Sequence, residues 1–351
     1  MVSESQLQYR GLERGEEPAY LNFAQEAWGK DSPQSDPRTL DWLYANPNTA
    51  GMHHDLIVLT DKNRIVGAHH RMRIPWRFNG QKVLVPSLHD LYILPAYRKA
   101  AVADSLTPPG LQIMLAAFER EPHIALFGLS PDAERIYKGM RIPTLRVFWL
   151  EKIRSRIKAG AQIVASRLGR RRRSTPQSRA TKNISGHELS VVPCPSIDDL
   201  LEALSIKPNA EKYPDWDLES YTWRFFDARG PKNILLLAHR EHQVVGRLVV
   251  SLGLRHRCVV ARIVELLFHD SAALGALLRG SEQVFSAASA SVCLAVTSSE
   301  EAAQRLVASG WRFREQPPGA RWFSRDRKQA PEDLWISGGA WDFGCDARIG
   351  D

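Results

Sequence analysis

Cysteine is scarce in this sequence, and the few copies present are far apart. The 351 residues include only four, Cys194, Cys258, Cys293 and Cys345, and none has a second cysteine at metal-ligand spacing. This distribution excludes a disulfide framework and a cysteine-based zinc site. It fits a reducing compartment, so we expect a cytoplasmic protein.

Long apolar runs are also missing. No stretch of about 18 apolar residues occurs, and residues 1–17 lack the apolar core that a secretory leader needs. We therefore expect neither secretion nor a membrane span. A content of 44% hydrophobic and 25% charged residues is that of a folded globular protein, and the length suits two hydrophobic cores better than one.

Positive charge is not spread evenly along the chain. Between Lys152 and Lys182 the sequence has eleven Lys or Arg residues and no Asp or Glu, which exceeds the net charge of +8 for the whole chain. Apolar residues recur there every three or four positions, as in Ile153, Ile157 and Leu168, before the run Arg170 to Arg173. A basic amphipathic helix of this kind could lie at an anionic membrane surface, which would make the protein peripheral. The alternative is a solvated connector between domains. No aromatic residues are interleaved with the cations, so we do not expect nucleic acid as a partner.

The stretch from Pro86 to Leu150 organises the rest of the chain. Its pattern predicts a strand at Leu88 to Leu94, a loop, a helix opened by Thr107 and Pro108, and a strand at His123 to Leu129. A second helix then begins at Ser130 and ends at Gly139, and Thr144 to Leu150 returns as a strand. The loop carries Arg98 and Lys99 beside small residues at a helix start, which suits a phosphate group. An ordinary basic turn is the alternative.

This stretch resembles the GNAT acyltransferase superfamily. Leu94, Pro95, Tyr97 and Arg98 match the family's Pro-x-x-Arg after its fourth strand, and Ile136 to Ile142 match its late helix. The resemblance implies that an acyl-CoA, acetyl-CoA or another, is the donor substrate, without a metal. The residues that it implies for binding acyl-CoA are Leu91, Ile93, Arg98, Lys99, Ala100, Ala101, Val102 and Ala103.

Two residues are candidates for catalysis. The resemblance implies that Tyr137 is the general acid that protonates the departing thiolate. Asp90 or His89 could take a proton from the acceptor, and because side chains alternate along a strand we expect only one of them, Asp90, to face the cleft. The same alternation argues against a metal site, since the adjacent His69 and His70 would point to opposite faces of the sheet.

The second half of the chain repeats the pattern of the first half. Trp223 and Gly246 recur at nearly constant offsets from Trp42 and Gly67, which indicates a diverged duplication. We predict an α/β (α+β) protein of two tandem GNAT-like domains, each a mixed, mainly antiparallel sheet flanked by helices. The predicted boundaries are 1–151 for the domain with the acyl-CoA loop, 152–186 for the basic helix and linker, and 187–351 for a degenerate second domain with a tail. Asp270 stands where the cationic loop should be, so we expect no acyl-CoA site there.

The function expected from these features is acyl-CoA-dependent N-acyltransfer, most simply of an acetyl group to an amine of a sugar or small metabolite. One alternative is a Fem-like transferase that takes an aminoacyl group from tRNA for cell-envelope synthesis, because Fem-type enzymes share the tandem arrangement. A non-catalytic module at an anionic surface is the other, favoured by Asp104 and by alanines where the family has glycines. Nothing in the sequence indicates an oligomeric state.

Overall fold

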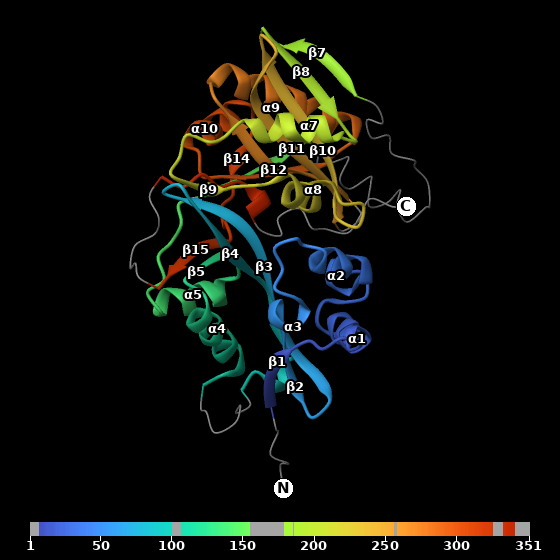
Figure 1. Ribbon diagram of the computed structural model, residues 1–351, viewed down its shortest axis with the longest axis vertical. Coiled ribbons are helices and arrows are strands. Elements are labelled where there is room, and N and C mark those ends of the chain that lie inside the picture. Colours follow the sequence, from blue (N-terminus) through green and yellow to red (C-terminus); the bar gives the residue numbers. More distant parts are fainter. Residues whose placement is uncertain are drawn as a thin grey trace. The chain divides into compact units, whose positions relative to one another are not determined.

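The chain folds into two compact units. The structure is a computed structural model that describes residues 7–99, 107–154, 179–184, 186–255, 258–325 and 333–340. The first unit comprises Met1–Pro75, Val83–Leu145 and Pro318–Pro331, and the second comprises Trp76–Lys82, Arg146–Pro317 and Glu332–Asp351. Figure 1 shows both units coloured along the sequence.

The first unit is built on a sheet of order β1-β2-β3-β4-β5-β15. Its strands are β1 (Leu7–Gly11), β2 (Leu56–Asp61), β3 (Arg64–Phe78), β4 (Gln81–Ile93), β5 (His123–Leu129) and β15 (Gly319–Ser324). The turn between β3 and β4 is Asn79-Gly80, and both residues have positive φ, 47° and 82°. This confirms the tight hairpin that the Asn-Gly pair predicts. The pairings β1–β2, β2–β3 and β5–β15 are antiparallel, whereas β4 and β5 run parallel.

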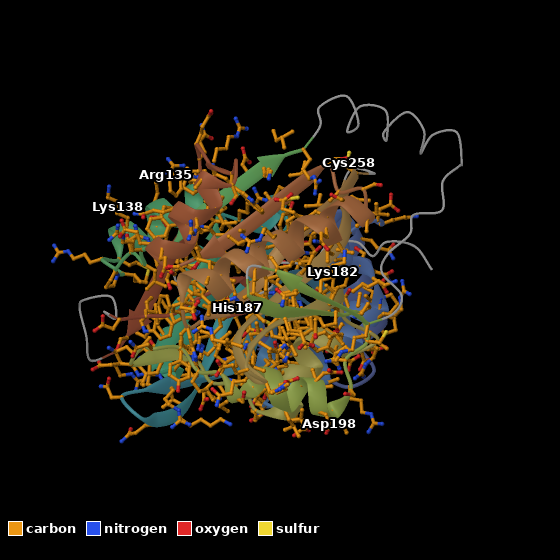
Figure 2. The ribbon with its side chains drawn as sticks, turned by 90° about the horizontal axis from the view of Figure 1, so that it is seen from above. Arg135, Lys138, Lys182, His187, Asp198 and Cys258 are labelled. Atoms are coloured by element: carbon orange, nitrogen blue, oxygen red, sulfur yellow. The ribbon has the colours of Figure 1, made fainter. Side chains whose placement is uncertain are left out.

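Helices cover both faces of this sheet. On one side lie α1 (Glu17–Trp28), η1 (Pro33–Ser35) and α2 (Pro37–Tyr44), and on the other lie α4 (Pro109–Arg120) and α5 (Pro131–Gly139) (Figure 1). The short α3 (Met52–Asp55) and η2 (Pro95–Tyr97) complete the unit. Tyr20, Phe23 and Ala24 share one face of α1 by their spacing and are buried there. On α5 the charged side chains of Arg135 and Lys138 lie at the surface (Figure 2). Tyr137 of the same helix is buried.

The second unit contains a sheet of order β14-β6-β13-β12-β11-β10-β8-β7. Its strands are β6 (Phe148–Ile153), β7 (Ala180–Ile184), β8 (His187–Val192), β10 (Lys232–Arg240), β11 (Gln243–Arg255), β12 (Cys258–Phe268), β13 (Val292–Thr297) and β14 (Arg312–Phe313). The short β9 (Lys212–Pro214) instead pairs antiparallel with the end of β3. The helices are α7 (Ile197–Ser205), α8 (Leu218–Phe226), α9 (Ser271–Ala287), α10 (Glu300–Ala308) and η3 (Gly338–Ala340). Here too one central pair, β12 and β13, is parallel.

The two sheets share a detail that supports the predicted duplication. Gly67 pairs with Leu59, immediately before a register shift between β2 and β3. Gly246 pairs with Ala238, immediately before the corresponding shift between β10 and β11. Both glycines are closely packed, since an added Cβ would lie 2.4 Å from Ile93 Cδ1 in the first case and 2.8 Å from Leu277 Cδ1 in the second. The same position in both hairpins therefore requires glycine for the same reason.

The two sheets also exchange strands, which the sequence pattern did not reveal. The strand expected at Thr144 to Leu150 was assigned to the first domain, but the structure places it as β6 in the second sheet, paired with β13 and β14. In return, β15 from the second half of the chain pairs with β5 in the first sheet. Strand periodicity records which face of a strand is buried, but not which neighbour it pairs with, so this expectation was wrong.

The basic segment is described only at its ends. Residues 155–178 lie outside the described part of the chain, so the predicted amphipathic helix is not described. At the ends, Lys152 and Arg154 lie 2.8 and 3.4 Å from the Glu282 carboxylate, and Arg179 lies 2.6 Å from Asp199. Among the helices of the described residues, none is long and apolar enough to cross a membrane.

Candidate functional site

The candidate site lies where the two parallel strands of the first sheet separate. The β4–β5 register consists of two pairs, Ser87 with Ala125 and Leu88 with Leu126. Beyond Leu88 the remaining residues of β4 have no recorded partner on β5. Along this part of β4 the strand β5 is therefore not the hydrogen-bonding neighbour, and one of the carbonyls there, that of Ile93, accepts from Arg98 instead.

Asp90 distorts β4 at this point. Its φ is +53°, in the left-handed region that few residues other than glycine adopt. The distortion interrupts the alternation of side chains, so that His89 Nδ1 lies 3.1 Å from Asp90 Oδ2. The expectation that separated the two side chains assumed a regular strand, and β4 is not regular at this position.

A hydrogen-bonded network surrounds this pair. Gln34, in η1, donates from Nε2 to Asp90 Oδ1 at 2.9 Å. The ring of His70 on β3 stacks on His89 with centroids 5.4 Å apart, and His70 Nε2 lies 2.6 Å from the Tyr20 hydroxyl on α1. Tyr20, His70 and Gln34 were not among the predicted site residues. No sequence pattern could have predicted them, because they are far from Asp90 along the chain. The packing of α1 and η1 on the sheet brings Tyr20 and Gln34 to the site.

The protonation states of the network follow from its environment. Burial by itself would raise the pKa of Asp90, but the hydrogen bond from His89, the charges of His89 and His70 when those rings are protonated, and the amide of Gln34 together lower it to about 2. Burial lowers the pKa of His70 to about 3, and that ring is neutral at pH 7. An ionised carboxylate can only accept, so His89 must donate from Nδ1 to Asp90. In a neutral His89 ring the lone pair is then on Nε2, the arrangement of an oriented base.

The predicted cofactor loop is described in part. Arg98 and Lys99 are exposed at the end of β4, and Arg98 donates from Nε to the Ile93 carbonyl at 3.0 Å while its guanidinium lies 5.3 Å from the centre of the Tyr92 ring. Ala100, Ala101, Val102 and Ala103 lie outside the described residues. The following helix begins with Pro108 and Pro109, which have no amide hydrogen.

Because Leu111 and Gln112 both donate to the Pro108 carbonyl, the start of α4 offers an anion only the Gly110 amide. Most of the donors for a pyrophosphate would have to come from the loop itself. The helix start is thus a weaker anion site than the sequence pattern suggests.

The other predicted site residues lie in contrasting environments. Leu91 is 36% exposed, whereas Ile93 is buried against Gly67 and Gly110. Tyr137 is buried on α5, 6.3 Å from Phe118 between ring centres, and burial raises its pKa so that the hydroxyl keeps its proton at neutral pH. Tyr137 packs with the α4–α5 layer, while the partners of Asp90 belong to the α1 side of the sheet. No contact between Tyr137 and Asp90 is recorded among the described residues.

The second unit has a carboxylate at the equivalent position, but in a different setting. Asp90 and Glu265 both stand two residues beyond the last parallel pair of their strand. Glu265 lies 2.9 Å from Arg247, and both side chains are buried, at 6% and 5% exposure. The Arg247 guanidinium also donates to the carbonyls of Ala203 and Ile206. A carboxylate held by a buried guanidinium is a structural ion pair and not an accessible base.

A second difference is that residues 334–340 occupy the place where β12 and β13 separate. Ser337 forms an antiparallel bridge with Thr297 at the end of β13, and Trp335 Nε1 donates to the Leu266 carbonyl of β12 at 3.2 Å. Gly339 is packed so closely that an added Cβ would lie 3.2 Å from the Val264 carbonyl oxygen and 2.5 Å from Phe225 Cζ. Arg224 fixes this segment by donating from Nε to the Gly339 carbonyl at 3.0 Å. In the second unit the chain itself therefore fills the position between β12 and β13, whereas no described segment is bridged to the ends of β4 and β5 in the same way.

Comparisons with known proteins agree with this architecture. A GCN5-related N-acetyltransferase from Anabaena variabilis has a TM-score of 0.53 and 13% identity, with 90% of this chain and 71% of that chain covered. A GCN5-related N-acetyltransferase from Kribbella flavida gives 0.52 and 15%, with 92% and 71% covered. The Saccharomyces cerevisiae N-myristoyltransferase with bound myristoyl-CoA gives 0.57 and 11%, with 92% and 80% covered.

No family model and no curated protein matches this sequence. At such low identities the likeness shows the fold alone. The chain has a tandem GNAT-like fold, as the sequence predicted, with two mainly antiparallel sheets flanked by helices.

Proposed function

We propose that this tandem GNAT-like chain is an acyl-CoA-dependent N-acyltransferase whose single donor site lies between β4 and β5 of the first unit. The observation that carries the proposal is the His89–Asp90 pair, placed by the distortion of β4 where that strand leaves β5. The structural neighbours support an acyl-CoA as the donor, since the yeast neighbour holds myristoyl-CoA. An acetyl group is the simplest acyl group, and an amine of a sugar or small metabolite is the acceptor class that we propose.

In the proposed reaction, the acceptor nitrogen attacks the thioester carbonyl and loses a proton to His89 Nε2, directly or through water. Asp90, ionised at neutral pH, orients the ring and stabilises the imidazolium that forms. Backbone amides of β4 beyond Leu88 stabilise the oxyanion. The carbon–sulfur bond then breaks and the thiolate takes a proton, for which we propose Tyr137 on the α4–α5 side of the sheet as the donor; water then reprotonates Tyr137, which the raised pKa of its hydroxyl favours.

The second unit has no donor site in this proposal. Residues 334–340 fill the corresponding position, and Glu265 is committed to Arg247. Acyl transfer should therefore depend on the acyl-CoA bound in the first unit.

The test is thermal unfolding of the whole protein with CoA, acetyl-CoA and longer acyl-CoAs, together with calorimetric titration. A ligand present at about a hundred times its dissociation constant adds about 2.7 kcal/mol to the stability of the folded state. We expect a raised midpoint for at least one thioester. Arg98→Glu should weaken binding about tenfold or more by replacing a cation with an anion beside the pyrophosphate.

The matched control is Arg14→Glu, which makes the same charge change in an exposed turn of the same unit and should leave binding unchanged. Unchanged affinity in Arg98→Glu would reject this placement of the donor. If no thioester shifts the midpoint of a cooperatively folded sample, the non-catalytic alternative is favoured. The two prolines that start α4 are the observation in favour of that alternative.

A further inference from the structure

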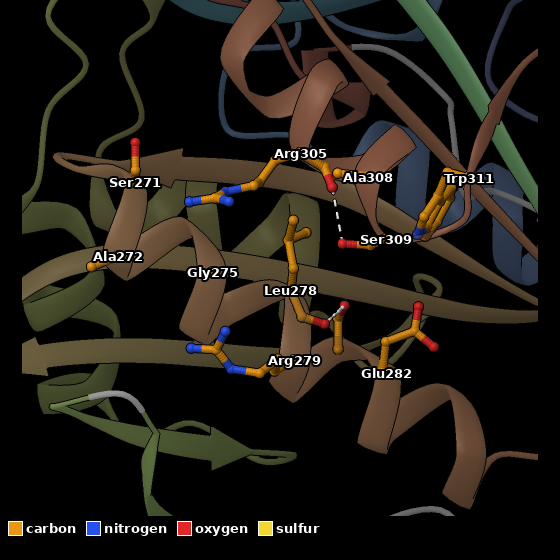
Figure 3. A pocket seen from close by; sticks show the side chains of 11 residues that line it. Ser271, Ala272, Gly275, Leu278, Arg279, Glu282, Arg305, Ala308, Ser309 and Trp311 are labelled. Atoms are coloured by element: carbon orange, nitrogen blue, oxygen red, sulfur yellow. Dashed lines mark hydrogen bonds between the residues drawn. The ribbon is translucent and has the colours of Figure 1, made fainter.

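A cavity in the second unit lies apart from the residues assigned above. It has a volume of about 480 Å³ and opens between α9 and α10. Figure 3 shows its lining, which α9 provides on one side and the end of α10 with the following residues on the other. A volume of this size is in the range of small-molecule sites.

Two arginines, one from each helix, give the cavity its chemical character. Arg279 of α9 and Arg305 of α10 extend their guanidinium groups on either side of Gly275 (Figure 3). The absence of a side chain at Gly275 makes room for this arrangement, because an added Cβ would lie 3.4 Å from Arg279 Nη1. Arg305 is exposed, and no ion pair within 4 Å joins it to an acidic residue of the described chain. The hydroxyl groups of Ser271 and Ser309 line the same space.

The acidic residues at this site do not cancel the positive charge. Glu282 is the one carboxylate among the described lining residues, and Lys152 and Arg154 already contact it, at 2.8 and 3.4 Å. Lys152 Nζ also donates to the carbonyl of Ser309, a lining residue, at 2.9 Å, so a third cation lies next to the cavity wall. Nearby, Glu301 accepts a hydrogen bond from Ser271, and Asp270 lies 2.7 Å from Arg240. Cations therefore exceed carboxylates around the opening.

We propose that this cavity binds a small phosphorylated ligand, independently of the acyl-CoA site proposed for the first unit. One guanidinium group can donate two parallel hydrogen bonds to phosphate oxygens. Two guanidinium groups on separate helices therefore suit a ligand with several anionic oxygens better than one with a single carboxylate. Leu278 and Ala308 add apolar surface that can hold the organic part of such a ligand. The volume exceeds that of one phosphate, which makes a diphosphate or a nucleotide a suitable occupant.

The test is calorimetric titration of the whole protein with inorganic pyrophosphate and, separately, with ADP. We expect binding that weakens as salt is raised, and the part of it that Arg305→Ala removes is assigned to this cavity, because the acyl-CoA loop proposed for the first unit can also accept a pyrophosphate. Arg305→Ala should weaken binding at least about tenfold through the loss of charge-assisted hydrogen bonds. Ala308→Glu places a carboxylate at an exposed position of the wall and should abolish binding with little effect on folding. Arg229→Ala, an exposed residue paired with Asp227 outside the cavity, is the control and should bind normally.

The two probes separate the possible sources of the phosphate. Tighter binding of ADP than of pyrophosphate assigns a role to the nucleoside, and equal binding assigns recognition to the phosphates alone. No binding of either probe at millimolar concentration, or equal binding in Arg305→Ala and the unaltered protein, would overturn the proposal. CoA binding that survives in Arg305→Ala while pyrophosphate binding is lost shows that the two sites are separate.

Discussion

Replacing Asp90 by Asn tests whether the site carries an ionised carboxylate. The substitution removes the charge but keeps the shape, and asparagine tolerates the left-handed backbone at this position at least as well as aspartate. The hydrogen bond from Gln34 can be kept, because the Asn side chain retains a carbonyl oxygen. The change therefore isolates the interaction between the carboxylate and His89.

The magnitude follows from the pKa of Asp90. Its ordinary value of 3.8 falls to about 2 in the folded protein, and each pKa unit corresponds to about 1.4 kcal/mol. The ionised side chain, 16% exposed, thus contributes at most about 2 kcal/mol to folding at neutral pH, since the part that comes from the charges of His89 and His70 is present only when those rings are protonated. Because the folded pKa lies below the unfolded one, this contribution is complete above pH 4 and is lost as the pH falls towards 2.

The assay is urea unfolding followed by tryptophan fluorescence at pH 7, 5, 4 and 3. Asp90→Asn should be less stable than the unaltered protein by about 1–2 kcal/mol at pH 7 and pH 5, and the difference should shrink below pH 4. Equal stabilities at pH 7, or a difference that stays constant down to pH 3, would refute this account of the pair. Where an amine acceptor is in hand, the same variant should lose about a hundredfold or more in kcat/KM, the scale of an impaired base.

Two further predictions concern the core of each unit. The pKa of His70 is lowered to about 3, so between pH 6 and pH 3 the unfolded chain binds a proton that the folded chain does not, and the free energy of unfolding should fall by about 1.4 kcal/mol for each pH unit. In urea unfolding of His70→Gln, the change of this free energy with pH should be smaller by about that amount. An unchanged pH dependence would contradict the neutral state of His70. Gly339→Val should destabilise the protein by about 1–3 kcal/mol, because the added Cβ would collide with Phe225. Gly139→Ala is the control, since the space around Gly139 is open, and it should change stability by less than about 0.5 kcal/mol. Equal effects of the two substitutions would disprove the tight packing of residues 334–340.

Local patterns were enough to predict much of the fold. The strand at His123 to Leu129, the helix that ends at Gly139 and the Asn79-Gly80 turn depend on residues close together in the chain, and all three are confirmed. The match of Gly67 with Gly246 predicted the duplication, because both positions have the same steric requirement. Asp90 was a candidate because of its place on the central strand. The sequence analysis assumed a regular strand, however, and so predicted that the side chains of Asp90 and His89 point to opposite faces.

The sequence by itself therefore determined the order of the elements, the repetition of that order in the two halves, and a strand, a cationic loop and a helix that resemble those of an acyltransferase. These are local properties, set by side-chain periodicity, turn chemistry and helix starts. Only the tertiary structure decided that β6 and β15 change sheets, that Gln34 and His70 reach the His89–Asp90 pair, and that residues 334–340 close the second unit. Each of these depends on contacts between residues distant in the chain, where the choice of partner follows from the packing of whole elements and leaves no periodic trace in the sequence.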